Sequence, residues 1–369
     1  MLDVAFAESL AQVDRGAWNA LFTDEVEDYD YLLAIEQAGL EGFRLRYVLV
    51  HEEDLLVAAA PAFLMGYRLE TTMAGAARRM AERVRRVTPG LFVLRLACIG
   101  SPCTERALIG LPQDAEPERR RALFKALVRG FEAAAGRHRC GLVALKDVAG
   151  DVLAMCSDEA ASLGLRAVGS LPSADLPIDF PDLDRYYERL SASARKDMRR
   201  KLRTLGQVRV EMRTNVDDVL DRIMELYAET RARAEATFEA LTPAYFQGVL
   251  RAMPGRAAVV LYYEGENLLA ANLLIHDDRT LVDKYFCMEG SRGRDLNLYF
   301  LSWFTNVRLC LESGWTRYHA GQAAQDVKLR LGGRLTESAH YFRHRNPFWN
   351  VVLQALAPLF ASDGAEAVA

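Results

Sequence analysis

The sequence has no C-x-x-C pair, no apolar run of 18 residues and no large excess of either charge. Its six cysteines are scattered, and several stand inside apolar stretches such as LRLACIG and YFCM. A reduced, mostly buried set of thiols is therefore expected, which indicates a cytoplasmic protein. Without a long apolar run, no transmembrane helix is expected. The first residues carry acids and lack a basic segment, so no secretory signal is expected.

The net charge and the spacing of potential metal-binding residues argue against nucleic-acid-binding proteins and metalloproteins. A net charge of -4 gives no general case for a nucleic-acid binder, so we expect no DNA partner and only a local site for any polyanion. No His, Cys and Asp spacing resembles a metal site, so no metal is predicted.

Length and composition indicate a globular enzyme-like protein with two domains. The chain has 369 residues, of which 51% are hydrophobic and 26% charged. A break in composition falls at residues 168–185, where three prolines and four aspartates occur in a short span. We therefore place an N-terminal domain at residues 1–170 and a C-terminal domain at 171–369.

Two stretches of the chain share one pattern. YVLVHEEDLLVAAAPAFLM and VVLYYEGENLLAANLLIH each read as a strand, an acidic turn and a second strand. A strand, a long helix and another strand follow each of them, which indicates an internal duplication. Outside this repeat, helical patterns are predicted around Val4–Leu21 and Tyr29–Ala38, and a basic helix at 67–90. The predicted fold class is α/β (α+β), with a mixed sheet flanked by helices formed twice.

The duplicated unit, the stretch SASARKDMRR at 191–200, and the series Gly321, Lys328 and Gly332 after a strand resemble the FemAB-like branch of the GNAT acyltransferase superfamily. The resemblance implies two tandem GNAT-like domains and transfer of an acyl group from a carrier to a small-molecule or peptide amine. The carrier in this superfamily is acyl-CoA, while acyl carrier protein thioesters and aminoacyl-tRNA serve relatives. The usual phosphate loop of GNAT proteins is replaced here by EGSRGRD at 289–295.

The loop at 289–295 is nevertheless a candidate phosphate site. It opens a helix, so its N–H groups and the helix dipole attract anions, with Arg292, Gly293 and Arg294 as the binding residues. The alternative is a solvated Gly-rich turn in which Asp295 caps the helix.

Acyl transfer to an amine needs a base and donors for the tetrahedral oxyanion. Asp326 is a candidate base, and Lys328 a candidate partner for a carboxylate or phosphate, with Gln322 nearby as a substrate contact; an ordinary exposed turn is the alternative. His319 and His340 lie in strand patterns that place them on neighbouring strands, and either is a natural base. Satisfied core histidines are the alternative for both.

Asp283 and Tyr285 alternate with apolar residues, so both are predicted to face one side of their strand. Tyr285 is then placed to protonate the leaving thiolate, and Asp283 to contact substrate, whereas a sheet-surface pair is the alternative. In the helix and loop before the hairpin, where the resemblance implies acceptor contacts, Tyr227, Thr230 and Phe238 are candidates.

The densest basic run lies at 195–203 and has Arg195, Arg199 and Arg203 on one helical face. Arg195 and Arg199 are predicted to hold a polyanionic carrier, and a solvated helix face is the alternative. The apolar segment NPFWNVVLQALAPLF is expected to pack on the domain or form a homodimer, or to lie on a membrane surface. Two other functions remain open: an aminoacyl-tRNA-dependent FemAB-type transferase, and a non-catalytic GNAT binding protein.

Overall fold

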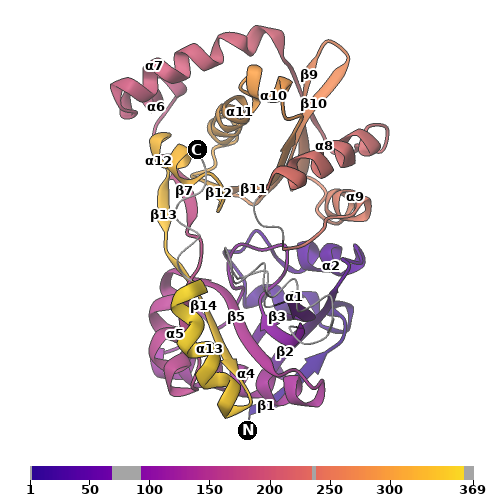
Figure 1. The fold of residues 1–369 in the computed structure, drawn as a ribbon, viewed down its shortest axis with the longest axis vertical. Coiled ribbons are helices and arrows are strands. Elements are labelled where there is room, and N and C mark those ends of the chain that lie inside the picture. The colour runs from indigo at the N-terminus through magenta and orange to yellow at the C-terminus, as the bar shows by residue number, and fades with distance from the viewer. Residues whose placement is uncertain (1, 69–92, 235–237, 361–369) are drawn as a thin grey trace. The chain divides into compact units, whose positions relative to one another are not determined.

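The computed structural model describes residues 2–68, 93–234 and 238–360. The chain divides into two compact units. Unit 1 consists of Met1–Leu32, Glu41–Leu171 and Glu337–Ala369, and unit 2 of Leu33–Leu40 and Pro172–Thr336. Figure 1 shows the elements of each unit.

Unit 1 contains a seven-stranded sheet in the order β1-β2-β3-β4-β5-β14-β6. The strands are β1 (Leu2–Ala7), β2 (Phe43–Glu52), β3 (Leu55–Arg68), β4 (Val93–Ile99), β5 (Leu142–Ala149), β6 (Arg166–Gly169) and β14 (Ser338–His344). The helices are η1 (Leu10–Gln12), α1 (Arg15–Ala20), α4 (Pro117–Arg137), α5 (Gly150–Ser162) and α13 (Pro347–Phe360), and α2 (Tyr29–Gln37) continues into unit 2. The core joins apolar side chains of α4 to those of β2, β3 and β5.

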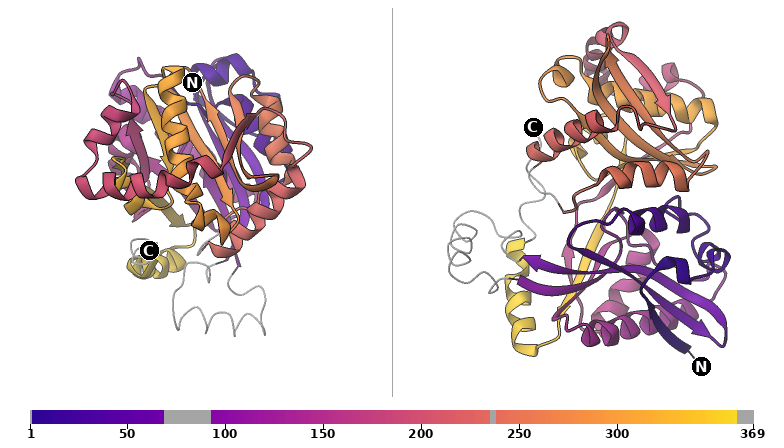
Figure 2. Two further views of the ribbon diagram at one scale, coloured as in Figure 1. Left: turned by 90° about the horizontal axis from the view of Figure 1, so that it is seen from above. Right: turned by 90° about the vertical axis from the view of Figure 1, so that its right-hand side faces the viewer.

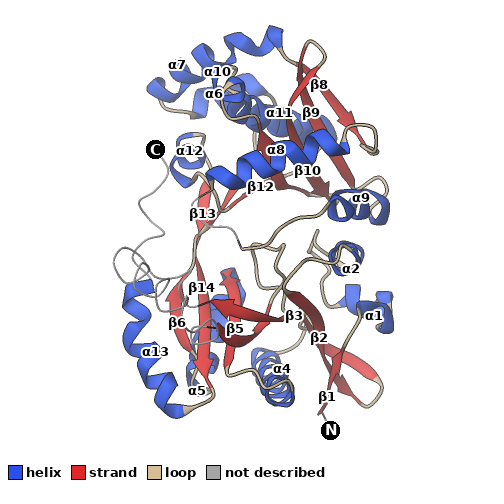
Figure 3. Cartoon of the chain, turned by 45° about the vertical axis from the view of Figure 1, so that its right-hand side comes forward, coloured by secondary structure: helices blue, strands red, loops and turns tan. Residues whose placement is uncertain are grey.

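Unit 2 contains a second seven-stranded sheet, in the order β13-β7-β12-β11-β10-β9-β8 (Figure 3). The strands are β7 (Ser173–Pro177), β8 (Arg209–Arg213), β9 (Ala257–Glu264), β10 (Asn267–His276), β11 (Thr280–Met288), β12 (Arg317–Gly321) and β13 (Arg334–Thr336). The helices are α6 (Leu183–Arg189), α7 (Ala192–Lys201), η3 (Leu202–Gln207), α8 (Leu220–Arg233), α9 (Pro243–Ala252), α10 (Arg292–Asp295), α11 (Leu298–Ser313) and α12 (Gln325–Arg330). In the left view of Figure 2, α11 is the gold helix lying along orange strands.

The two sheets have the same plan, which confirms the predicted duplication. In each, four antiparallel strands lead to one parallel pair, β4 with β5 in unit 1 and β11 with β12 in unit 2. Each sheet then receives a strand from the other half of the sequence. β7 follows β6 along the chain yet pairs with β12, and β14 follows β13 yet pairs with β5. The chain therefore crosses between the units at 171–172 and at 336–337, in addition to entering unit 2 for Leu33–Leu40.

Several sequence expectations need correction. The predicted helix at Val4–Leu21 begins as a strand, because Leu2–Ala7 pairs with Tyr47–Glu52. Residues 337–369 fall in unit 1 rather than in a C-terminal domain 171–369, because β14 pairs with β5 and β6. The predicted basic helix at 67–90 lies outside the described residues apart from its first two positions, which end β3.

Candidate active site

The parallel pair β11 and β12 sets the position of the candidate site in unit 2. The two strands pair only over Thr280–Val282 and Arg317–His319, whereas β11 continues to pair with β10 as far as Met288. The strands therefore part after Val282 and His319. The residues that follow on each strand surround this point of separation.

His319 is held at the separation by a carboxylate. Its side chain is buried, and its Nδ1 lies 2.9 Å from Oδ1 of Asp175, its register partner on β7. A carboxylate oxygen only accepts, so a hydrogen is assigned to Nδ1. Such a pair orients an imidazole as a base.

The side chain of Lys328 stabilises the end of β12. It lies in α12, is 4% exposed, and its Nζ donates to the carbonyl oxygens of Ala320 and Gly321 at 2.5 and 3.0 Å. The ammonium is thereby committed to the backbone next to His319. Gln322 comes directly after Gly321 in the chain and is partly buried. Asp326 lies in the first turn of α12 and is exposed.

Asp283 is the first residue of β11 beyond its last pair with β12. Its Oδ2 accepts from Asn272 at 3.3 Å, Asn306 at 3.1 Å and the hydroxyl of Tyr318 at 3.0 Å. These donors come from β10, α11 and β12. Asp283 therefore ties together the elements on both sides of the separation, and this oxygen is committed to the fold.

Tyr285 does not share a face with Asp283, contrary to the alternation expected for a regular strand. The register shifts between Leu273, opposite Tyr285, and Leu274, opposite Asp283, so that Lys284 is an extra residue. Asp283 consequently contacts α11, while the ring of Tyr285 lies 4.9 Å from that of Tyr227 on α8. Burial raises the pKa of the Tyr285 hydroxyl above its ordinary value.

The parity of the strands brings Tyr285 and His319 to one face. Tyr318 contacts Asn306 of α11, so its neighbour His319 faces away from α11, as Tyr285 does. The sequence predicts both residues for the site, but it pairs Tyr285 with Asp283 and His319 with His340.

The other residues predicted on this side lie along α8 and the loop after it. The hydroxyl of Tyr227 accepts from the N–H of Leu241 at 2.8 Å. Thr230 Oγ1 accepts from the N–H of Met288 and donates to its carbonyl, which fixes α8 to the end of β11. Phe238 is 41% exposed.

The donors of the loop at 289–295 are occupied by carboxylates of the chain. The N–H of Gly290 donates to Glu229 at 2.6 Å, and those of Ser291 and Arg292 donate to the side chain of Glu289 at 3.2 Å. The guanidinium of Arg292 pairs with Glu264, which raises its pKa. Gly293 is buried against Met288, and Arg294 is exposed. A phosphate at this loop has to displace these carboxylates.

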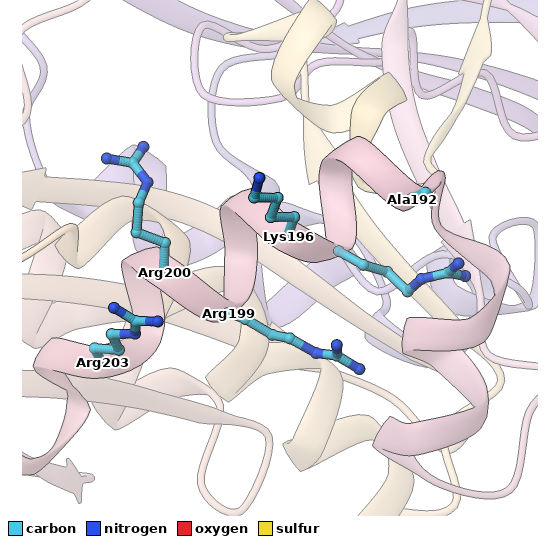
Figure 4. Close-up of a pocket in the computed structure, with 6 residues that line it drawn as sticks. Ala192, Lys196, Arg199, Arg200 and Arg203 are labelled. Carbon is cyan, nitrogen blue, oxygen red and sulfur yellow. The ribbon is translucent and has the colours of Figure 1, made fainter.

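The basic run at 195–203 lies on α7 and the start of η3. An open hollow of about 360 Å³ lies along this segment. Its lining residues are Ala192, Arg195, Lys196, Arg199, Arg200 and Arg203 (Figure 4). Arg195 donates to the carbonyls of Glu188 and Leu190, so it caps the end of α6. Arg199 is exposed.

His340 and His319 do not meet on neighbouring strands, because His340 lies in the sheet of unit 1. There its Nδ1 accepts from the N–H of Asp147 at 3.1 Å. The Asp147 carboxylate is 2% exposed and also binds Lys146 and Ser170. Burial lowers the pKa of His340, against an opposing effect of Asp147.

Sequence reasoning missed Asp175, Asn272, Asn306 and Glu229. Asp175 stands in the Pro-rich break at 168–185, which read as a linker because nothing there indicates that β7 joins the sheet of unit 2. Asn272 and Asn306 are fully buried, and a lone Asn inside an apolar strand or helix was the available signal.

Other predicted features can be placed as well. The free cysteines Cys98, Cys103, Cys140, Cys287 and Cys310 are buried. Within the described residues, no group of three or more His, Cys, Asp or Glu side chains is arranged to hold a metal. No described helix is long and apolar enough to cross a membrane. On α13, Leu353 packs into unit 1, whereas Phe348, Trp349 and Val351 are exposed.

Comparisons with known proteins agree with this plan. Residues 177–356 match the FemAB-like family, described as peptidoglycan biosynthesis/recognition. The structure of FemX has a TM-score of 0.61 at 13% identity, over 94% of this chain and 98% of that chain. A tandem GNAT protein from the clavulanic acid biosynthesis pathway has a TM-score of 0.56 at 13% identity, over 94% and 99%.

A third solved structure is the C-terminal domain (DUF2156) of a putative lysylphosphatidylglycerol synthetase from Agrobacterium fabrum. Its TM-score is 0.55 at 13% identity, over 98% of this chain and 100% of that chain. No curated protein matches the sequence.

The sheets and these likenesses define the class: the protein has a fold of two GNAT-like units, similar to that of the tandem GNAT protein. Within that class, residues 177–356 match the FemAB-like family model, and the whole fold is similar to that of FemX.

Proposed function

We propose that this protein is an N-acyltransferase in which an amine attacks a carrier thioester directly, at the separation of β11 and β12. The observation that carries the proposal is the buried contact of His319 with Asp175 at that separation, on the same face as Tyr285.

The proposed reaction has two steps. The amine nitrogen attacks the thioester carbonyl carbon, and Nε2 of His319 takes the proton that the nitrogen loses. The C–S bond then breaks, and the hydroxyl of Tyr285 protonates the departing thiolate. Backbone N–H groups near Asp283–Tyr285 stabilise the oxyanion between these steps. Lys328 acts indirectly in this scheme, by fixing the strand end that carries His319.

The acceptor proposed is a peptide amine or a small amine. Support comes from the FemAB-like match, whose description is peptidoglycan biosynthesis/recognition. On the α8 side, the proposed aromatic contacts of the acceptor are the exposed ring of Phe238 and the partly buried ring of Tyr285, which packs on the buried Tyr227. Asp326 remains a less favoured base, because it is exposed and His319 has a fixed orienting partner.

A second candidate is aminoacyl transfer from aminoacyl-tRNA. The likeness to FemX favours it, as does a loop at 289–295 whose donors are occupied by Glu229 and Glu289. Either donor uses the same attack on a carbonyl carbon.

The test is a transfer assay with acetyl-CoA, long-chain acyl-CoA, an acyl carrier protein thioester and aminoacyl-tRNA, each with peptide and small amines. We expect one donor class to be consumed, and His319→Gln to abolish its use while the matched control His51→Gln retains it. If no donor is consumed, or if His319→Gln retains full activity, the proposal is wrong.

A further inference from the structure

The exposed face of α7 has a strong positive charge in a protein whose net charge is negative. Six cations and one carboxylate occupy the nine positions from 195 to 203. Arg195 and Arg199 lie four residues apart on α7, so their side chains follow one another at a step of about 6 Å along the helix, and Arg203 follows in η3. Figure 4 shows the side chains of Lys196, Arg199, Arg200 and Arg203 extending from this segment.

The described part of the chain leaves most of the charge on this face unpaired. The carboxylate in the run, Asp197, already contacts Arg200 at 2.8 Å, Lys201 at 3.2 Å and Arg330 at 3.4 Å. Among the residues that the structure describes, Lys196, Arg199 and Arg203 form no ion pair or side-chain hydrogen bond. Three adjacent cations without an acid keep their charge available to a partner.

α7 contacts two helices that are connected to β12, the strand that carries His319. Asp197 on α7 joins Arg330 on α12, the helix whose Lys328 holds the end of β12. On its other side, the ammonium of Lys201 lies 3.4 Å from the ring centre of Phe300 in the first turn of α11. α7 therefore contacts both the helix that precedes β12 and the helix that follows it.

The loop at 289–295, the other candidate anion site, offers few available donors to a pyrophosphate. In the loop at 289–295, three N–H groups donate to Glu229 and Glu289, and Arg292 pairs with Glu264. A negatively charged acyl donor is therefore expected to bind at α7 rather than at this loop.

The surroundings of α7 favour a protein over a nucleic acid. Within the described residues, none of the large exposed apolar side chains lies between 183 and 207, so no aromatic platform for bases is present there. Beside the patch, Leu329 is 47% exposed, next to Arg330. Cations next to an exposed leucine match a helix with acidic residues and an apolar one among them.

We propose that α7 and the start of η3, with Lys196, Arg199 and Arg203 as the principal cations, form the docking surface for an acidic helix of an acyl carrier protein. The carrier's prosthetic arm then delivers the thioester to the separation of β11 and β12. This inference rests on the proposed function for its donor chemistry, but the docking itself is measured separately.

The first measurement is binding of the full-length protein to a purified acyl carrier protein that bears an acyl group. We expect the affinity to fall as salt rises, because exposed charges are screened beyond a Debye length of about 10 Å at 0.1 M. The variant Arg199→Glu is expected to weaken binding at least about tenfold. The exposed Arg166 of unit 1 supplies the matched control Arg166→Glu, which is expected to bind as the wild type does.

A competing experiment uses transfer RNA in place of the carrier protein. If transfer RNA binds through Arg199 and the carrier protein does not, or if Arg199→Glu binds the carrier protein normally, the docking proposal is overturned. Thermal unfolding of the variant shows that it is folded, and the salt dependence of the wild type tests the docking without any variant.

Activity separates this inference from the proposed function. The ratio of kcat/KM for the carrier-protein thioester to that for the corresponding acyl-pantetheine is expected to fall at least about tenfold in Arg199→Glu. If the carrier protein binds through α7 but no donor is consumed, the docking proposal is supported and the proposed function is refuted. Transfer with an unchanged ratio leaves the function standing and refutes the docking surface.

Discussion

Replacing Lys328 by Met tests whether a buried ammonium holds the end of β12. The side chain is 4% exposed and donates to the carbonyls of Ala320 and Gly321. Hydrogen bonds to a charged group contribute about 1.5–3 kcal/mol each, and a buried acceptor left without a donor loses stability. Removing the charge also removes its desolvation cost. The free energy of unfolding is therefore expected to fall by about 2–4 kcal/mol.

The assay is equilibrium unfolding in urea, followed by the fluorescence of Trp303 and Trp315 in unit 2. The matched control is Lys196→Met on α7, where the lysine is exposed, and its effect is expected within about 0.5 kcal/mol. Hydrogen exchange at residues 317–321 is expected to accelerate in Lys328→Met alone. A loss below about 0.5 kcal/mol in Lys328→Met would show that the contacts with Ala320 and Gly321 do not hold the strand.

Three further predictions concern other parts of the chain. Burial lowers the pKa of His340, so the unfolded chain binds a proton at this residue more readily than the folded chain does. The free energy of unfolding is therefore expected to decrease as the pH falls below 6.5. His340→Gln is expected to reduce this pH dependence in unfolding experiments. Tyr285→Phe is expected to lower kcat about 10- to 100-fold with little change in KM, since it removes only the proton for the leaving thiolate. Glu289→Ala frees the N–H groups of Ser291 and Arg292, so calorimetry is expected to show tighter binding of coenzyme A than in the wild type.

Much of the fold could be predicted because local patterns determine it. The hairpin at 43–68, the helix Pro117–Arg137 and the duplication follow from alternation, helical periodicity and turn residues. The exchange of β7 and β14 could not be predicted, because a five-residue and a seven-residue strand carry no local signal of which sheet they join. Sheet membership here depends on contacts distant in sequence.

The candidate site was predicted in part for the same reason. His319, Tyr285 and Lys328 were named from residue type and position, but the partner Asp175 lies 144 positions away from His319. The bulge at Lys284 reverses the face of Tyr285, and alternation alone cannot show such an insertion. Glu229 and Glu289 fill a loop that sequence reasoning interpreted as open to phosphate, because only the fold brings Glu229 to Gly290.

The contact between His319 and Asp175 is tested most directly by single-turnover acyl transfer in Asp175→Asn. The asparagine is similar in size but no longer holds the hydrogen on Nδ1, so Nε2 ceases to be a reliable base. We expect the rate to fall about 10²- to 10⁴-fold with donor binding unchanged, and Asp175→Glu to recover part of it. A rate in Asp175→Asn within about threefold of the wild type would contradict His319 as the base oriented by Asp175.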